Sequence, residues 1–405
     1  MNNLFDWFNE RFPLLSTWKR HFSEYYVPKN LNFLYLFGSL GLLLLVNQLI
    51  TGLWLTMFYT PTTEGAFSSV EAMMRDVSFG WLFRYMHSTG ASAFFIVMYM
   101  HMFRGLLYGS YQKPRELVWF LGMILYFLLI MEAFFGYLLP WGQMSYWGAQ
   151  VITSLVGVIP YLGDTLVTWL RGDYSVTDVT LHRFFALHVI GIPILLVFMV
   201  FLHLIALRQV GSNNPEGIDL NKMLDSQGKP IDGIPFHPYY TIKDLLGMVL
   251  FAIIFFAVVF FAPEMGGYFL EPNNFIPANP LITPDDIVPM WYMAPFYALL
   301  RAIPNQLIGI GLMALALFFL FLLPWLDKSP VRSLRYKGRY SRISLLLFVL
   351  SFLLLGYLGT IPVTPLRLIL ARVSIILYFS YFLLMPFYTQ LEACRSVPLR
   401  IRSDE

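Results

Sequence analysis

Eight long apolar segments recur along the chain, and they constrain its fold more than any other feature. An α-helix needs about 20 apolar residues to cross the hydrocarbon core of a bilayer. A helix also satisfies its backbone hydrogen bonds internally, as a segment in lipid must. Charged residues make up only 13% of the chain, about half of their share in soluble domains. The sequence therefore predicts an all-α integral membrane protein with eight transmembrane helices.

The eight predicted spans, A to H, divide the chain into four parts. The spans are predicted at residues 32–58, 80–108, 115–138, 181–208, 244–262, 305–325, 343–359 and 366–388. The parts are an N-terminal amphipathic surface helix, a bundle of helices A–D with a long outer C–D loop, a cytoplasmic D–E loop, and four further helices E–H with a long outer E–F loop, at residues 1–30, 31–210, 211–243 and 244–405. Such a surface helix lies in the plane of the membrane.

Basic residues are unequally shared between the two sides of the predicted membrane. The side that holds both chain ends carries 20 of the 27 Lys and Arg residues. Lys and Arg concentrate in cytoplasmic loops. We therefore predict that both termini are cytoplasmic and that, in a bacterium, this multi-pass protein lies in the inner membrane.

Two outer connections are too long to be simple turns. Residues 139–180 are rich in aromatic and apolar residues and predict short helices at the interface, and residues 263–304 are rich in proline. Long loops of this kind often line a site or dock a partner.

Four histidines lie inside two of the predicted spans. In sequence number, His87 and His101 are 14 apart, and His188 and His203 are 15 apart. An α-helix turns by about 100° per residue, so the two histidines of the first pair point within about 40° of each other, and those of the second pair within about 60°. Fourteen residues of helix rise by about 21 Å. Each span thus presents two imidazoles on one face, at two depths in the bilayer. The extra residue in the second pair predicts a small rotation or helix distortion near Ile192–Pro193.

Both histidine-bearing spans run from outside to inside, so the histidines pair by depth. His87 and His188 share the outer level, and His101 and His203 share the inner level. Two imidazoles at each level fit bis-histidine ligation of one haem per level, which makes an electron carrier without an open coordination site. A single intramembrane histidine is often only a packing or hydrogen-bonding residue. A zinc or copper site would need three or four ligands at one level.

Glycines and arginines support the haem hypothesis. Two neighbouring spans carry glycine pairs with the same separation as the first histidine pair, Gly38 with Gly52 and Gly122 with Gly136. Glycine lets a backbone approach a flat group closely, although small residues also serve ordinary helix packing in membranes. Arg84 and Arg104 flank the first histidine pair. Each could bind a haem propionate, and the alternative is that each extends to the interface.

At this point the motifs resemble a known family. The segments RYMHSTGASAFFIVMYMHMFRG, GYLLPWGQMSYWGAQVIT, HRFFALH, GSNNP, IPFHPYYTIKD and LLRAIPNQ are similar to cytochrome b of the cytochrome bc1 complex (quinol–cytochrome c reductase), of the bacterial type. The resemblance runs from about residue 30 to the end of the chain. Here the first four spans and the last four occur in one chain. In the photosynthetic version of the family, they are divided between two chains.

The resemblance implies a catalytic subunit that works by a protonmotive Q cycle. Quinol is oxidised at an outer site (Qo), and quinone is reduced at an inner site (Qi). By the family pattern, His87 and His188 ligate the outer haem bL, and His101 and His203 ligate the inner haem bH, both non-covalent b-type haems. The expected partners are a Rieske iron–sulfur protein, a c-type cytochrome subunit, membrane lipid, quinone and a second copy of the complex, with no nucleic acid.

The resemblance also assigns the residues of the outer site. These are Tyr137, Met144, Trp147, Gly148, Ile152, Pro289, Met290, Trp291, Tyr292, Met293 and Tyr297. An aromatic, mostly apolar pocket suits a quinone ring. The alternative for these aromatic residues is an interfacial belt.

One departure from the family pattern concerns the quinol proton. Where the family usually has Pro-Glu-Trp-Tyr, this chain has Met290 in PMWY, and methionine cannot accept a proton. Glu132 lies in an apolar span near the outer haem level, where a charge is expensive. We therefore predict that Glu132 accepts the proton, with Asp285 and Asp286 as rivals. The alternative is a structural hydrogen bond from Glu132 to a neighbouring helix.

A second departure concerns the inner site. The family often has a histidine just before GSNNP, where this chain has Arg208. Asp244 matches the family's inner-site aspartate, and Lys243 lies beside it. We expect an inner quinone site with altered hydrogen bonding, and menaquinone is one candidate for the quinone.

Two other functions remain open at this point. A di-haem quinone-reactive membrane anchor of a dehydrogenase would use the same chemistry, but such anchors are usually shorter and lack the PWGQMS and PMWY loops. A transporter or channel could use intramembrane histidines as proton relays.

Overall fold

The computed structural model describes residues 2–12 and 24–401. It contains eight helical segments that are long and apolar enough to cross a membrane, as predicted. They are Phe33–Thr56, Gly80–Tyr108, Glu116–Leu138, Asp178–Val210, Phe236–Phe261, Gln306–Leu326, Arg339–Gly359 and Pro365–Leu391. The largest difference from the prediction is the start of the fifth segment, where Phe236–Tyr240 precedes the helix proper.

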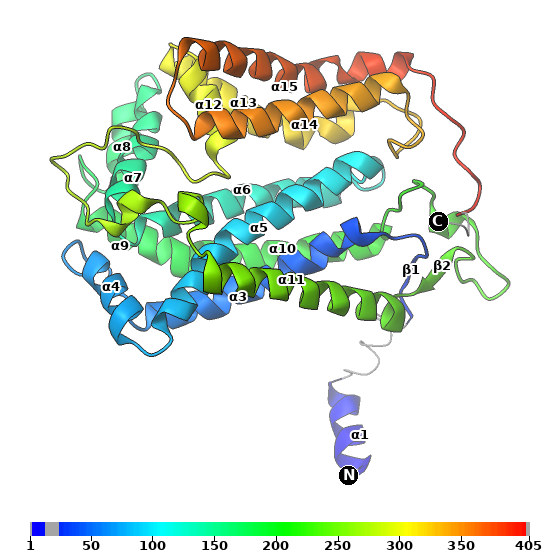
Figure 1. Ribbon diagram of the computed structural model, residues 1–405. Helices are drawn as coiled ribbons and strands as arrows, with labels where there is room; N and C mark the ends of the chain where they lie inside the picture. The colour runs from blue at the N-terminus through cyan, green and yellow to red at the C-terminus, as the bar shows by residue number, and fades with distance from the viewer. Residues whose placement is uncertain (1, 13–23, 402–405) are drawn as a thin grey trace.

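The main spanning helices form two layers (Figure 1). They are α3 (Leu36–Thr56), α5 (Gly80–Tyr108), α6 (Glu116–Leu138), α10 (Ile192–Val210), α11 (Thr241–Phe261), α13 (Gln306–Leu326), α14 (Arg339–Gly359) and α15 (Pro365–Leu391). Helix α3 packs on α5 and α10 packs on α6, while α11 lies against α5 and α3. Helices α13, α14 and α15 lie together above α5 and α6. The first four spans therefore form one layer together with α11, and α13, α14 and α15 form the other.

The helix with the first histidine pair has well-defined ends. Phe79 precedes α5 with φ 61°, and Gly109 follows it with φ 62°. A left-handed residue after the last turn commonly ends a helix, and glycine adopts it without strain. A Cβ at Gly109 would also lie 2.3 Å from the carbonyl oxygen of Arg332, so the inner loops approach each other closely here.

Shorter elements gather at the two ends of the spanning helices. One end carries α4 (Ala66–Asp76), α7 (Gln143–Leu155), α8 (Gly163–Arg171), α9 (Asp178–Ala186) and α12 (Ala294–Ala302). Helices α7 and α8 are the short helices predicted within residues 139–180. Helix α4 was not predicted.

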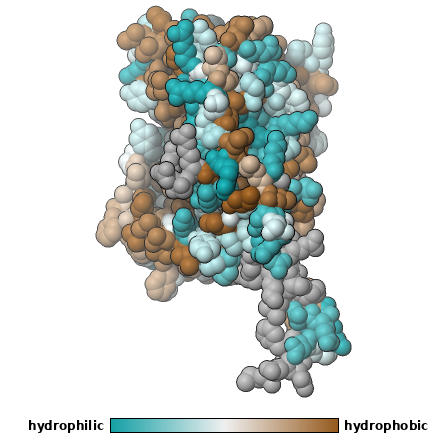
Figure 2. Space-filling view, turned by 90° about the vertical axis from the view of Figure 1, so that its right-hand side faces the viewer, coloured by the Kyte–Doolittle hydropathy of each residue, from teal (hydrophilic) through white to brown (hydrophobic). Residues whose placement is uncertain are grey.

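The opposite end carries the described C-terminal end of the chain and the segment before the first span (Figure 1). Strands β1 (Tyr26–Pro28) and β2 (Gly233–Pro235) pair antiparallel there, with Tyr26 opposite Pro235. Of the surface helix predicted for residues 1–30, the structure describes α1 (Asn2–Arg11), residues 13–23 lie outside the described residues, and residues 26–28 are strand. Figure 2 views this end and shows hydrophilic residues spread over its face, with hydrophobic residues around them.

A buried carboxylate joins three distant segments at this end. Asp232 pairs with Lys29 and Arg400, each at 3.1 Å, and accepts a hydrogen bond from the backbone N–H of Ile401 at 3.0 Å. Burial acts to raise the pKa of Asp232, but these partners together hold it below its ordinary value. The segment before the first span, the D–E loop and the C-terminal tail are therefore fixed to one another.

Candidate functional site

The outer pair of predicted haem ligands meets in the structure. His87 lies on α5 and His188 on the π-helical turn η4 (Leu187–Gly191). Their ring centres are 6.1 Å apart, and the ring planes are inclined at 87°. A histidine nitrogen binds a metal at about 2 Å, so two imidazoles on opposite sides of one iron have ring centres about 6 Å apart. The observed separation fits bis-histidine ligation.

Hydrogen bonds determine which nitrogen of each outer ring is available to a metal. The Thr51 hydroxyl donates to the Asn47 carbonyl at 2.6 Å, so its oxygen accepts from Nδ1 of His87 at 2.9 Å. Nδ1 of His188 lies 3.0 Å from the backbone carbonyl of Glu132, which can only accept. In both neutral rings Nδ1 carries the proton, and Nε2 keeps the lone pair that a metal needs.

Each of the four predicted glycines faces one of the four histidines. A Cβ added to each glycine would lie close to the Cε1 atom of the facing ring. The distance would be 3.4 Å for Gly38–His101, 3.1 Å for Gly52–His87, 3.3 Å for Gly122–His203 and 2.4 Å for Gly136–His188. Helix α3 therefore backs the two rings of α5, and α6 backs the two rings of the opposite span. The shared spacing of glycines and histidines corresponds to direct contact, because any larger residue would crowd the ring.

A cavity of about 420 Å³ lies at the outer histidine level. Both outer imidazoles line it, and Arg84 is the cation in its wall. The other lining residues are mostly apolar and include Leu45, Leu49, Phe94, Leu129, Ala133, Val189 and Pro193. An apolar cavity with two facing nitrogens and one cation fits a flat, mostly apolar group that carries a carboxylate at its edge.

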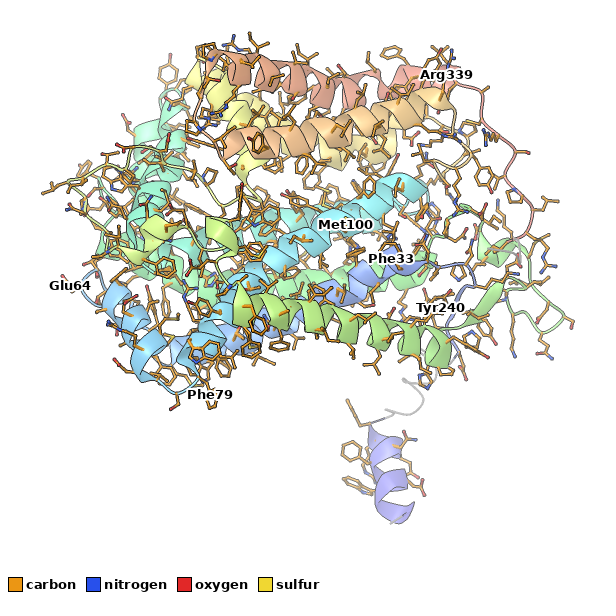
Figure 3. All side chains as sticks on the ribbon, in the orientation of Figure 1. Phe33, Glu64, Phe79, Met100, Tyr240 and Arg339 are labelled. Atoms are coloured by element: carbon orange, nitrogen blue, oxygen red, sulfur yellow. The ribbon has the colours of Figure 1, made fainter. Side chains whose placement is uncertain are left out.

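The inner pair lies farther along the same helices. Figure 3 labels Met100, the residue before His101, between Phe79 at the outer start of α5 and the opposite end of the molecule, where Tyr240 lies. Nη2 of Arg104 lies 3.4 Å from Nδ1 of His101. The buried Nε of Arg104 has no hydrogen-bond partner among the described residues. A carboxylate of a bound group would satisfy it.

A wide helical turn absorbs the extra residue between the second pair of histidines. In η4 the N–H of Ile192 donates to the carbonyl of Leu187, five residues back. A π-type turn holds one residue more than an α-helical turn, so the longer interval from His188 to His203 covers the same rotation as the shorter histidine interval in α5. The distortion predicted near Ile192–Pro193 is present and ends at that pair.

Other metal arrangements find no candidate in the part of the chain that the structure describes. No group of three or more His, Cys, Asp or Glu side chains could hold an ion by itself there. His182, six residues before His188, is half exposed and contacts Asp178 at 3.1 Å. It is not among the residues that line the cavity, in agreement with the helical geometry, which puts it about 120° around the helix from His188.

Three of the eleven predicted outer-site residues line the same cavity. Tyr137, Met290 and Tyr292 line it directly. The rest lie on α7, on α12 or in the loop before α12, and they are Met144, Trp147, Gly148, Ile152, Pro289, Trp291, Met293 and Tyr297. A Cβ on Gly148 would lie 3.8 Å from the Tyr137 ring, so α7 approaches the cavity at that position. The structure thus brings together two segments that are far apart in the sequence.

The two outer loops are joined into one unit. Gln143 donates from its backbone to Ile276 at 2.9 Å and accepts from the backbone of Asn279 at 2.7 Å. The backbone N–H of Ser145 donates to Asn274 Oδ1 at 2.7 Å. Because Asn274 also lines the cavity, these bonds connect the loop crossing directly to its wall. Asp285 and Asp286, the rival proton carriers, are not among the lining residues of this cavity.

Glu132 contacts a predicted haem ligand. Its Oε1 lies 3.1 Å from Nδ1 of His188, and its Oε2 is buried without a hydrogen-bond partner among the described residues. The residue also lines the cavity. One carboxylate oxygen therefore faces the ligand ring, and the other is free for a further partner.

At the inner end, Asp244 contacts the helix that backs His101. Ser39 Oγ donates to Asp244 Oδ2 at 2.6 Å, and Ser39 directly follows Gly38, which faces the His101 ring. A carboxylate and a hydroxyl therefore lie beside the inner histidine level. This pair can exchange a proton and hydrogen-bond with a carbonyl or hydroxyl of a ligand.

The other two predicted inner-site residues lie over aromatic rings. The Arg208 guanidinium carbon is 3.9 Å from the centre of the Tyr25 ring, and Lys243 Nζ is 5.0 Å from that of Tyr240. Cation–π contacts of this kind hold a cation in place. Arg208 is thus positioned by the segment before the first span rather than by Asp244.

Comparisons with known proteins agree with this geometry. The family model described as Cytochrome b/b6/petB matches residues 22–211, and the model described as Cytochrome b(C-terminal)/b6/petD matches residues 277–379. Cytochrome b of Allochromatium vinosum is 55% identical over 98% of both chains, and that of Rickettsia prowazekii is 50% identical over 95% of this chain and 93% of the relative. A solved structure titled Hyperthermophilic respiratory Complex III matches with a TM-score of 0.89 and 40% identity, over 96% of this chain and 99% of that one.

The chain belongs to the cytochrome b family. It is a cytochrome b of the bc1 complex, the core subunit of the quinol–cytochrome c oxidoreductase, and it acts in electron transport. Members of the family bind two b-type haems and act with quinone. The match over the whole chain decides against a dehydrogenase anchor and against a transporter.

Sequence reasoning missed several polar residues at this cytochrome b site. Thr51 and Ser39 were available as hydroxyls within apolar spans, next to Gly52 and Gly38. Glu271 lies in the E–F loop, directly after Leu270 of the cavity wall, and has one buried oxygen without a partner among the described residues. Burial raises the pKa of the Glu271 carboxyl. No local pattern distinguishes it from the other acidic residues of that loop.

Proposed function

We propose that this chain oxidises quinol at the outer cavity, moves one electron across the membrane and reduces quinone at the inner site, in a Q cycle that adds to the proton gradient. The observation that carries the proposal is the fourfold match of one glycine to one histidine at two levels. Bound haems supply the one-electron carriers between the two sites.

The four histidines would hold the two haems. His87 and His188 would bind the outer haem through Nε2, because both Nδ1 atoms are engaged in hydrogen bonds. His101 and His203 would bind the inner haem. Arg84 and Arg104 would each neutralise a propionate, which removes the cost of a buried charge on either side.

The outer cavity wall would hold the quinol ring. Tyr137, Met290 and Tyr292 supply apolar and aromatic surface, which binds the ring and excludes water. Glu132 is our candidate for accepting a quinol proton, at the Oε2 atom that has no partner among the described residues. Glu271 is a rival, because it directly follows Leu270, which lines the cavity, and has a buried oxygen without a partner among the described residues.

The inner site would use Asp244 with Ser39, and Arg208 with Lys243 would supply positive charge at the same end. Arginine in place of the usual histidine donates hydrogen bonds but cannot accept them. A quinone carbonyl would therefore accept from Arg208, while protons would reach it by way of Asp244.

The remaining partners follow from the assembly in which relatives work. A Rieske iron–sulfur protein and a c-type cytochrome subunit would dock at the joined outer loops, where Tyr161, Trp169 and Tyr174 are exposed. Such exposed aromatic residues are common at interfaces. We further propose a homodimeric complex in a bacterial inner membrane, with both termini in the cytoplasm, because the basic residues concentrate at that end.

The proposal is tested by following haem reduction in the purified complex. Quinol should reduce two b-type haems of separate midpoint potential. An outer-site inhibitor should block oxidant-dependent reduction through the outer cavity, while an inner-site inhibitor should block re-oxidation of the inner haem. A single haem, or reduction that neither inhibitor affects, would overturn the proposal.

A further inference from the structure

Helix α5 has two functional faces. At 100° per residue, Ser92 lies about 140° around the helix from His87, and Tyr99 lies about 160° from His101. Ser92, Phe95 and Tyr99 follow one another at intervals of three and four residues, so they form a single stripe. The stripe faces away from the predicted haem ligands.

The whole stripe contacts the loop before α12. The Trp291 indole N–H donates to Ser92 Oγ at 3.2 Å. The Phe95 and Tyr292 rings stack, with centres 3.8 Å apart and planes inclined by 4°. Both loop residues belong to the PMWY segment, so the helix and this segment form one packed unit.

Tyr99 fixes the backbone of this segment. Its hydroxyl donates to the Tyr292 carbonyl at 2.6 Å and accepts from the Tyr126 hydroxyl at 3.2 Å. Tyr126 and Tyr292 are buried, at 4% and 3% exposure, so water cannot replace these bonds. A buried carbonyl without its donor is costly.

These contacts set the position of one cavity wall. Met290, Tyr292 and His87 all line the cavity. Because α5 carries both His87 and the stripe, one rigid element fixes the distance between the loop wall and the outer haem level. We propose that Tyr99 is a positioning residue for the outer quinol site, acting through the Tyr292 carbonyl. This inference rests on the proposed quinol site at the outer cavity.

The test is Tyr99→Phe in the intact complex, with Tyr126→Phe as the matched control. Loss of one net hydrogen bond corresponds to about fivefold, so Tyr99→Phe should raise the KM for quinol and weaken an outer-site inhibitor about fivefold. Tyr126→Phe keeps the bond to Tyr292 and should change both by less than about twofold. Both haem potentials and the inner-site reaction should remain at wild-type values in both variants.

Several outcomes would overturn the inference. It fails if Tyr99→Phe leaves quinol KM and inhibitor affinity unchanged, or if it impairs the inner-site reaction equally. If the Tyr99→Phe complex does not assemble, Ser92→Ala replaces it. Ser92→Ala removes only the hydrogen bond from Trp291 and should shift both the KM for quinol and the inhibitor affinity. If neither quantity shifts, the inference fails. Failure of the proposed quinol site itself is recognised separately, because wild-type turnover would then be insensitive to the outer-site inhibitor.

Discussion

At Gly136 a single added methyl group decides whether the facing histidine ring can keep its place. Gly136 is the tightest, because a Cβ there would lie 2.4 Å from Cε1 of His188. In a closely packed interior, an overlap of this size forces the ring to move. At the other three glycines an added Cβ would lie 3.1 to 3.4 Å from the facing ring, so that ring could stay with a small shift. The identity of these residues therefore follows from their contact with the histidine rings more than from helix packing.

Gly136→Ala should displace the His188 ring and lose the outer haem, while the inner haem remains. A reduced-minus-oxidised spectrum with redox titration measures this directly. The matched control is Gly311→Ala in α13, where an added Cβ meets nothing within 4 Å. Retention of both haems at wild-type potentials in Gly136→Ala would contradict this account of the glycines.

Glu132→Gln should slow quinol oxidation steeply, by about 100-fold for the loss of a general base, and leave both haems bound. The amide keeps the size of the side chain but removes a negative charge 3.1 Å from the His188 ring. Negative charge near a haem stabilises the oxidised iron, so the midpoint potential of the outer haem should also rise.

The control for this variant is Glu271→Gln, which removes the rival carboxylate from the E–F loop. Near-normal turnover in Glu132→Gln would exclude Glu132 as the proton acceptor. Slow turnover in Glu271→Gln instead would assign that role to the loop.

At the scale of single elements, the π-helical turn is the feature that reconciles unequal spacings. It lies immediately before Pro193, which lacks the N–H that a regular helix would use at that point. The turn places His188 and His203 on the face that meets α6, where Gly136 and Gly122 lie. The sequence indicated a distortion from spacing and proline alone, and the structure defines its type and residues.

Deletion of Ile190 should convert the wide turn to a regular one and keep both haems, because it removes a residue from the turn itself and leaves the regular helix from Ile192 to His203 unchanged. Ile190 is 59% exposed, so little packing is lost. Deletion of Val197, which is 46% exposed within regular α10, is the control. It shifts His203 by about 100° relative to the turn and should lose the inner haem. Identical haem spectra for the two deletions would show that the turn does not set the register.

At the scale of the whole molecule, predictions from sequence succeeded where a pattern is local. Apolar length located the eight spans, and the repeated four-turn spacing located the paired histidines and the glycines that face them. Contacts between distant segments could not be predicted, because nothing local encodes them. The crossing of Gln143 with Asn279, and the anchoring of Tyr292 by Tyr99, are examples of this kind. The strand at Tyr26–Pro28 was missed for the same reason, since it exists only by pairing with Gly233–Pro235.

The most direct test of the central claim is a redox titration of the b-haem spectrum in four complexes, each with one histidine replaced by leucine. His87→Leu and His188→Leu should both lose the outer haem and keep the inner one. His101→Leu and His203→Leu should show the opposite pattern, and His182→Leu, as a control, should retain both haems. Loss of a haem in His182→Leu, or loss of different haems in His87→Leu and His188→Leu, would contradict the paired assignment.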